Sequence, residues 1–465
     1  MLGYTATALR DACRSRCSSG NTGPRPLSQN PTHPRAPTKS LATSFCDPGG
    51  PVRIVNPQPV DLSTSWTNGT ASVPSSEPLS GPPLARVLQL VHRRREVSRS
   101  ELTHQLGLSR TAIGELVGEL VQLRLVRTGG PDRSRGGPGR PSPRVSLDPA
   151  GPLALAAQVH QSRVTMATVG LGAQVINLEQ DDADAADLAA VRAALGGWIQ
   201  RETRGRAGRR IVGIGIAVPG LVRSDGFVYS APYLGWASID LRAALARGTS
   251  SELTIEVGND ANLAALGEHR HGAGAGATTL LCLLAEDVGV GGGLVHHGEL
   301  FTGSAGYGLE AGHLQVNPRG RRCPCGARGC LQVQCDSQAL LGAAGRPVPA
   351  TNPAAAATLV LDAAQDGDPD CQKAVAQIAD WLATGLTGLV NLLDPDRIAL
   401  LGLHRKLARQ CHARLLNRIR ADALVAQPAE IELVPGMLDE PVLIGAAERV
   451  LESLLRNPRL AAAAT

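Results

Sequence analysis

The spacing of apolar residues divides the chain into stretches of different texture. Residues 1–82 show neither a helical nor a strand period and are rich in proline, serine and threonine, a composition typical of disorder. We expect an unstructured N-terminal extension, which is either an interaction tail or an over-extended start of translation. A short periodic stretch follows over residues 83–147, a longer one over residues 152–455, and residues 456–465 form a tail.

The stretch 83–147 has the pattern of helix, short helix, turn and helix. An apolar stripe over residues 84–91 predicts the first helix. Ser98 and Glu101 form a capping box that opens the second helix, Gly107 permits a turn, and Ser109 caps a third helix. This order predicts a helix-turn-helix, whose last helix reads the major groove through its N-terminal residues. Those residues are Ser109, Arg110, Thr111, Gly114 and Glu115.

Two short strands, residues 125–127 and 144–146, follow with a glycine-rich loop between them. The loop carries Arg133, Arg135 and Arg140, which suit a wing lying along the phosphate backbone or in the minor groove. Residues 84–146 hold twelve arginines against five acidic residues, whereas the whole chain is only +5. A compact basic module on a near-neutral body is typical of a DNA-binding domain. The alternative is a helical pair used for dimerisation, with solvated arginines.

The longer stretch alternates buried strands with helices. Residues 164–169, 211–218 and 280–284 read as strands, and residues 187–201 and 262–269 read as helices. Such alternation predicts an α/β body. No apolar run approaches the roughly 18–20 residues that cross a bilayer, so we expect no membrane partner. Ten cysteines in 465 residues are too sparse for a disulfide scaffold, which favours a reducing, cytoplasmic setting.

Four potential metal ligands lie close together in the sequence. His313 is followed by Cys323, Cys325 and Cys330. One imidazole and three thiolates complete a tetrahedral zinc site with no open position. We therefore expect a structural Zn²⁺ that holds this loop rather than a catalytic metal.

At this point the chain resembles the ROK family, which comprises sugar kinases and sugar-responsive repressors with an added winged helix. The matching segments follow the family's order over roughly residues 152–455. They are Gly213-Ile-Gly-Ile-Ala-Val-Pro219-Gly220, Pro232-Tyr-Leu-Gly-Trp236, Gly258-Asn259-Asp260-Ala261-Asn262, Gly289-Val-Gly-Gly-Gly293, Gly308-Leu-Glu310-Ala-Gly-His313 and Cys323-Pro-Cys-Gly-Ala-Arg-Gly-Cys330-Leu-Gln. The resemblance implies a two-lobed, actin-like body with ligands bound between the lobes.

The resemblance also implies roles for single residues. Asn259, Asp260, Glu310 and His313 would contact sugar hydroxyls, and Gln332 stands where the family has a glutamate. In a kinase, Asp260 would be the general base that takes the proton of the attacked hydroxyl. The structural alternative for Asp260 is the N-cap of the helix that follows.

The phosphate-binding loops depart from the kinase pattern. The family's Asp-x-Gly-Gly-Thr loop reads Gln158-Val-His160-Gln161-Ser162, and its Gly-Thr-Gly reads Asp287-Val288-Gly289. Side chains in place of glycines obstruct the approach of backbone to phosphate, and an added carboxylate repels it. Near the C-terminus, Gly402-Leu403 stands where the family has Gly-Gly near the adenosine. On the sugar side, Tyr233 replaces the family's asparagine before Leu-Gly-Trp.

These patterns together predict a cytoplasmic transcriptional repressor and not an enzyme. It would bind operator DNA as a homodimer or homotetramer and respond to a sugar or sugar derivative in the cleft. Two alternatives stay open. One is an ATP-dependent, glucokinase-like sugar kinase, and the other is a DNA-binding regulator that needs no ligand.

Overall fold

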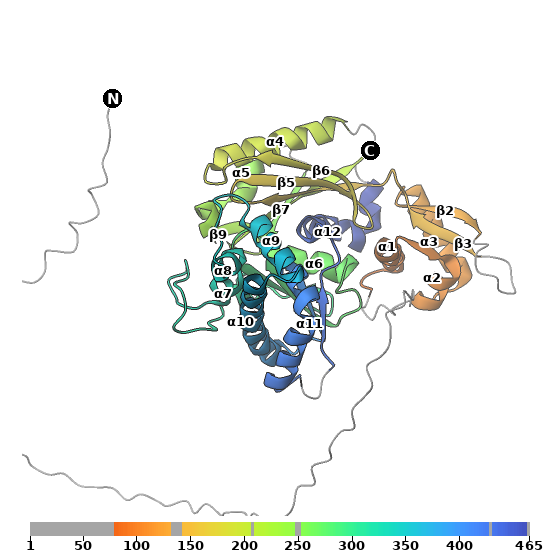
Figure 1. The fold of residues 1–465 in the computed structure, drawn as a ribbon. Helices are drawn as coiled ribbons and strands as arrows, with labels where there is room; N and C mark the ends of the chain where they lie inside the picture. The colour runs from red at the N-terminus through yellow and green to blue at the C-terminus, as the bar shows by residue number, and fades with distance from the viewer. Residues whose placement is uncertain (1–78, 132–141, 206–208, 247–252, 427–429, 463–465) are drawn as a thin grey trace, which may run out of the picture. The chain divides into compact units, whose positions relative to one another are not determined.

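The computed structural model describes residues 79–131, 142–205, 209–246, 253–426 and 430–462 (Figure 1). The first elements, called here the N-terminal module, are three helices and an antiparallel sheet of order β1-β3-β2. Their bounds are α1 Pro83–Arg94, β1 Glu96–Ser98, α2 Arg99–Leu106, α3 Arg110–Gln122, β2 Val126–Pro131 and β3 Pro143–Leu147. Strand β1 was not expected from the sequence. The glycine-rich loop with Arg133, Arg135 and Arg140 lies outside the described residues.

The capping residues and the turn glycine of this module adopt the conformations that the sequence predicts. The Ser98 hydroxyl accepts a hydrogen bond from Glu101 N at 3.2 Å, and the Glu101 carboxylate accepts one from Ser98 N at 2.8 Å. Gly107 ends α2 in the left-handed region at φ 66°, which glycine adopts without strain. The buried face of α3 consists of Ile113, Val117 and Leu120, and Leu116 beside them is half-buried.

The first lobe of the body is built on a five-stranded sheet of order β11-β7-β4-β5-β6. Strands β11, β7 and β4 run parallel, and β5 and β6 are antiparallel additions. Helix α4 covers one face of this sheet in Figure 1, and α12 lies on the other. The bounds are β4 Leu153–Val159, β5 Arg163–Gly170, β6 Gln174–Asp182, α4 Leu188–Gly205, β7 Ile211–Val218, β8 Leu221–Val222, β9 Phe227–Ala231, η1 Pro232–Leu234, β10 Trp236–Asp240, α5 Leu241–Ala246 and β11 Thr254–Asn259.

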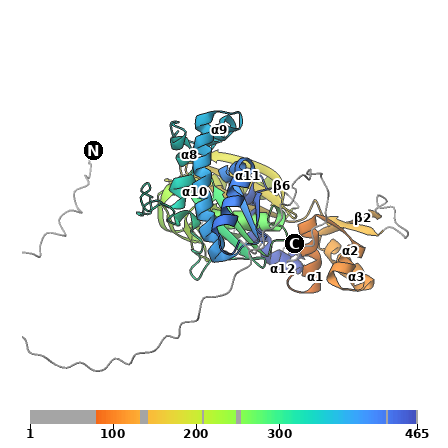
Figure 2. The same ribbon diagram turned by 60° about the horizontal axis from the view of Figure 1, so that its bottom comes forward.

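The second lobe repeats this plan with the sheet order β14-β13-β12-β15-β16. Helices α8 to α11 gather beside one another in Figure 2, and α11 contacts β15 and β16. The bounds are α6 Asp260–His271, β12 Thr279–Ala285, β13 Val290–His296, β14 Glu299–Leu300, η2 Ala311–His313, α7 Leu331–Cys335, α8 Ser337–Ala343, α9 Pro353–Gln365, α10 Pro369–Leu393, β15 Arg397–Gly402, α11 Leu403–Asp422, β16 Glu432–Pro435, α12 Pro441–Arg456 and η3 Pro458–Ala462.

The two sheets share one topology. In each, the first strand of the lobe is central, the next two extend the sheet antiparallel on one side, and the last two extend it parallel on the other. The α/β body with two lobes is therefore as predicted. The expected strand over residues 211–218 coincides with β7, and those over residues 164–169 and 280–284 fall within β5 and β12.

Helices α6 and α12 lie between the two sheets and contact each other (Figure 1). The apolar side chains of α12 belong to the same buried cluster as those of α1 and β4, for example Leu443, Leu88 and Ala154. One continuous core therefore runs from the N-terminal module into the body. Among the described residues, no helix combines the length and the apolar character that crossing a bilayer requires.

Candidate functional site

The centre of the site is the start of α6, directly after the parallel strand β11. Asn259 is the N-cap, because its Oδ1 accepts a hydrogen bond from Asn262 N at 3.0 Å. The alternative that Asp260 caps the helix is therefore wrong. The strand extends to Asn259, so Asp260 becomes the first helical residue, with Oδ1 2.8 Å from Ala261 N. Asn259 also donates to Gly220 O at 3.0 Å, which leaves one amide proton and one lone pair for a ligand.

Three carboxyl groups gather around this helix start. Burial raises the pKa of Asp260 to about 6. Burial and then the negative charge of Asp260 raise the pKa of Glu286 to about 7, and the same two causes raise the pKa of Glu310 to about 7. Carboxylates this close repel one another unless a ligand supplies hydrogen-bond donors. Sugar hydroxyls are such donors.

Polar contacts join the two lobes beside this carboxyl cluster. Gln158 of β4 donates to Glu286 at 2.8 Å, and His160 Nδ1 lies 3.5 Å from the same carboxylate. Arg163 of β5 pairs with Asp287 at 2.9 Å. Glu286 and Asp287 follow β12 in the second lobe, so all three contacts cross between the lobes. The pocket that holds Asp260, Glu286 and part of this contact set has a volume of about 40 Å³.

These contacts occupy the place where the sequence departs from the kinase loops. The side chains of Gln158 and His160 reach across to Glu286, where glycines would leave the backbone open to phosphate. A larger cleft of about 1390 Å³ continues outward from them, lined among others by Arg163, Asp287 and Lys406. The cleft is therefore kept, and Gln158 and His160 are among the side chains that line it.

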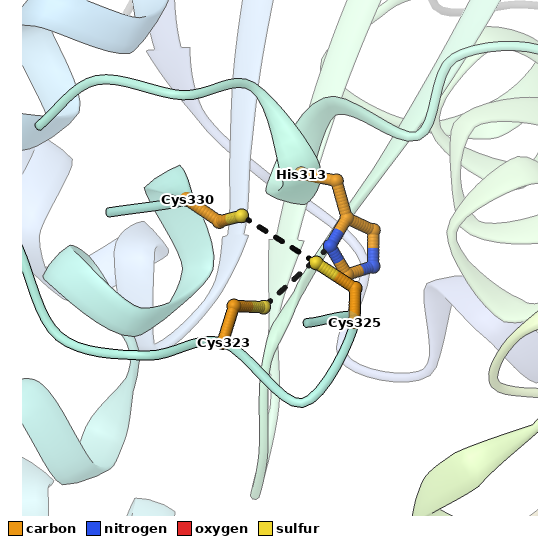
Figure 3. A group of neighbouring side chains, drawn as sticks. All are labelled: His313, Cys323, Cys325 and Cys330. Atoms are coloured by element: carbon orange, nitrogen blue, oxygen red, sulfur yellow. Dashed lines mark hydrogen bonds between the residues drawn. The ribbon is translucent and has the colours of Figure 1, made fainter. Parts of the chain in front are cut away.

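The predicted metal ligands converge, as Figure 3 shows. His313 Nδ1 lies 3.7 Å from Cys323 Sγ, and Cys325 Sγ lies 3.7 Å from Cys330 Sγ. All four ligand atoms lie within 4.8 Å of one another. Two sulfurs about 2.3 Å from a tetrahedral ion would be about 3.8 Å apart, so these spacings fit one zinc ion.

Gln332 and His313, which the family resemblance assigns to the sugar site, both contact the cysteine cluster. Gln332 Nε2 lies 3.1 Å from Cys323 Sγ and 3.2 Å from Tyr233 Oη. His313 directs Nδ1 to the cluster, so its Nε2 is left for a second partner. Gln332 therefore links the cysteine cluster to Tyr233 of the first lobe.

The residues predicted to read DNA lie on one end of α3. Ser109 caps the helix, with Oγ accepting from Ala112 N at 3.1 Å. Arg110, Thr111 and Glu115 are exposed, and Gly114 is half-buried. The first turn of α3 therefore presents its polar side chains to solvent.

Sequence reasoning missed Glu286 and Arg163 as parts of the cleft. Their partners lie more than 120 positions away in the chain, and no motif connects them. The one available signal was Asp287, the neighbour of Glu286, which stands where the family has a glycine.

Comparisons with known proteins agree with this arrangement. A xylose repressor of Caldicellulosiruptor bescii is 24% identical over 389 residues, which cover 81% of this chain and 96% of the repressor. A glucokinase of Halalkalibacterium halodurans is 35% identical, over 41% of this chain and 61% of the kinase. The kinase match thus extends over less than half of this chain, whereas the repressor match extends over most of both proteins.

Solved structures share the fold. A ROK family transcriptional regulator, a homologue of the Escherichia coli Mlc protein, superposes with a TM-score of 0.63 at 24% identity and covers 80% of this chain and 97% of its own. A ROK hexokinase of Thermus thermophilus has a TM-score of 0.53 at 28% identity, over 63% of this chain and 96% of its own. The sequence profile of the ROK family matches residues 189–451. The chain therefore belongs to the ROK family.

Proposed function

We propose that this chain is a transcriptional repressor whose affinity for operator DNA is set by a sugar bound between the lobes. The observation that carries the proposal is the state of the cleft. The sugar-side carboxyl groups are in place, while Gln158, His160 and the Arg163–Asp287 pair stand where the kinases have open, glycine-rich phosphate loops. A body that keeps the sugar-side residues and loses the phosphate loops suits a sensor better than a kinase.

In this proposal the N-terminal module is a winged helix-turn-helix. The first turn of α3 enters the major groove, and the residues that contact DNA are Ser109, Arg110, Thr111, Gly114 and Glu115. Arg133, Arg135 and Arg140 of the wing contact phosphates. Two or four copies bind a symmetric operator, as a homodimer or homotetramer, in the cytoplasm.

The sugar is held by the residues around the start of α6. Asp260 and Glu310 accept hydrogen bonds from hydroxyl groups, and Asn259, His313 and Gln332 complete the polar surface. The relatives named xylose repressors make D-xylose the first candidate. The ligand acts by preferring one arrangement of the lobes, and linkage then requires DNA affinity to change as well.

A structural Zn²⁺ would be held by His313, Cys323, Cys325 and Cys330. When bound, it neutralises the thiolates and fixes the loop that carries His313. Because Nδ1 of His313 faces the sulfurs and would supply its lone pair to the metal, Nε2 carries the proton and can donate it to the sugar.

The test is fluorescence anisotropy of the full chain on DNA from upstream of its own gene and on fragments enriched from genomic DNA. Scrambled DNA of equal length is the reference, at physiological salt, with and without D-xylose, D-glucose and N-acetyl-D-mannosamine. We expect a specific site bound at least ~10³-fold more tightly than scrambled DNA, and a change in affinity with one sugar. Equal binding to all DNA, together with sugar-dependent ADP release from ATP, would favour the kinase.

A further inference from the structure

A fully buried carboxylate lies where the N-terminal module meets the body. Glu448 of α12 has no solvent exposure, and both of its oxygens are engaged. Oε1 accepts from His92 Nε2 at 2.8 Å and from His271 Nε2 at 2.9 Å, and Oε2 accepts from Arg270 Nη1 at 3.1 Å. His92 belongs to α1, and Arg270 and His271 end α6. One carboxylate therefore joins three helices, and we call these four residues the Glu448 joint.

The hydrogen bonds determine where His92 carries its proton. Gly172 N donates to His92 Nδ1 at 2.9 Å, so the neutral ring holds its proton on Nε2 and donates it to Glu448. Arg95 Nε donates to Gly172 O at 3.0 Å. The N–H and the C=O of Gly172, in the turn between β5 and β6, are therefore both hydrogen-bonded to the end of α1 and the residue after it. The end of α1 is thus attached both to α12 and to the first lobe.

Two imidazoles and a carboxylate within 4.8 Å of one another could also hold a metal ion. The hydrogen-bond pattern opposes this. His92 Nε2 is a donor, because Nδ1 is already an acceptor. The Arg270 cation occupies the other carboxylate oxygen, where it would repel a divalent ion. The cluster is therefore a hydrogen-bonded joint.

Helix α6 connects this joint to the effector site, since it begins at Asp260 and ends at His271. It crosses α12 with the two backbones in contact. A Cβ atom on Gly445 would lie 1.7 Å from Leu263 O, and one on Gly267 would lie 2.5 Å from Pro441 O. With no side chain between them at the crossing, the two helices move together rather than slide past each other.

Two cavities of about 160 Å³ each lie along the same path. One is lined by Asn259, Asn262 and Arg270, among others, and the second by His92, Arg270 and Glu448. Both are lined in part by the exposed Glu299, so they open to the surface. They give the side chains between the effector site and the joint room to change position.

We propose that Glu448 is the positioning residue through which a sugar bound at the start of α6 changes the placement of the N-terminal module. The inference rests on the proposed function and specifies its regulation. A displacement of α6 and α12 together relative to α1 takes the His92 hydrogen bond away from a buried charge. Such a bond is worth roughly 10- to 100-fold in an equilibrium constant, which lies in the usual range of allosteric coupling.

The experiment compares Glu448→Gln with the wild-type full chain. The measured quantity is the ratio of DNA dissociation constants with and without a saturating amount of whichever of the three sugars shifts the wild type. We expect this ratio to approach 1 in Glu448→Gln, a loss of about tenfold or more, while calorimetry still detects sugar binding. The matched control is Glu452→Gln on the same helix, whose carboxylate pairs with Arg449 and Arg456 of α12 itself. It should keep the wild-type ratio.

The outcomes separate the two proposals. A wild type that no sugar affects defeats the proposed function, whereas a wild-type ratio in Glu448→Gln defeats the joint alone. Loss of one bound metal per chain in Glu448→Gln also defeats the joint, in favour of a metal site. If Glu448→Gln does not fold, His92→Phe removes the donor on α1 and keeps a ring of similar size. A wild-type ratio in that variant overturns the proposal.

Discussion

The side chains of Gln332 and Tyr233 meet across the cleft, with the amide Nε2 3.2 Å from the hydroxyl Oη. Tyr233 lies in η1 of the first lobe and Gln332 in α7 of the second. Each departs from the ROK pattern, which has asparagine and glutamate at these positions. The two residues that depart from the pattern therefore contact each other. A glutamine can donate to the tyrosine and to the cysteine sulfur, which a glutamate cannot do.

Replacing Gln332 by glutamate should weaken the binding of Zn²⁺ at the cysteine cluster. The amide nitrogen lies 3.1 Å from Cys323 Sγ, and a carboxylate there would face a thiolate. We expect Gln332→Glu to bind Zn²⁺ about 10- to 100-fold more weakly, measured by competition with a chromogenic chelator. Gln338→Glu on α8 is the control. Equal zinc affinity in both variants would mean that the contact does not support the metal site.

Asp260→Asn should stabilise the protein while abolishing the sugar response. The pKa of Asp260 is raised to about 6 by burial, so ionising it above that pH disfavours the folded state. A neutral asparagine keeps the acceptor for Ala261 N and removes this penalty. The gain in unfolding free energy, on the order of 1 kcal/mol, should be present at pH 8 and absent at pH 4, where the folded-state carboxyl is protonated.

Denaturant titrations at the two pH values measure this difference. The same variant should bind sugar much more weakly, because an NH2 donor replaces one of the two acceptor oxygens and the other oxygen already accepts from Ala261 N. For the wild type, sugar affinity should rise between pH 5.5 and pH 8 as the carboxyl ionises. A flat pH profile would remove Asp260 from the binding site.

Local chemistry explains which parts of the site the sequence could predict. The Ser98–Glu101 capping box and the His313–Cys323–Cys325–Cys330 group involve residues close together in the chain, with spacing that only one arrangement satisfies. The choice of Asn259 rather than Asp260 as N-cap could not be made, because both residue types cap helices well. It depends on where β11 ends.

Long-range polar contacts were beyond sequence reasoning. His92 and Glu448 are 356 positions apart, and Gln158 and Glu286 are 128 apart. Nothing in the local pattern distinguishes these side chains from solvated ones. Their burial follows from how α1 lies against α12 and how the lobes face each other, which are properties of the tertiary packing.

Breaking the contact between the lobes should make the effector pocket easier to enter. Arg163 and Asp287 form a half-buried ion pair beside a pocket of only about 40 Å³, too small for a monosaccharide but sufficient for a few water molecules. We expect Arg163→Ala to populate the open arrangement more and to raise sugar affinity several-fold, measured by calorimetry. Arg201→Ala, which breaks a pair within the first lobe, should leave the affinity unchanged. A weaker affinity in Arg163→Ala would instead make the pair part of the bound state.

The variant Ser109→Asp should separate the structural role of Ser109 from its role in DNA binding. Ser109 caps α3, with Oγ accepting from Ala112 N, and aspartate is an equally good N-cap. Ser109→Asp should therefore keep the stability of the wild type to within about 0.5 kcal/mol. Its negative charge would face the phosphates, so operator affinity should fall by about tenfold or more.

Asn352→Asp is the matched control, since it adds the same charge at the N-cap of α9 in the body, where Oδ1 accepts from Ala355 N. Thermal unfolding and anisotropy on the selected operator measure the two properties side by side. If both variants keep full operator affinity, the N-terminal turn of α3 does not lie against DNA. If only Ser109→Asp loses it, with an unchanged melting temperature, the loss arises from the contact with DNA and not from unfolding of the helix.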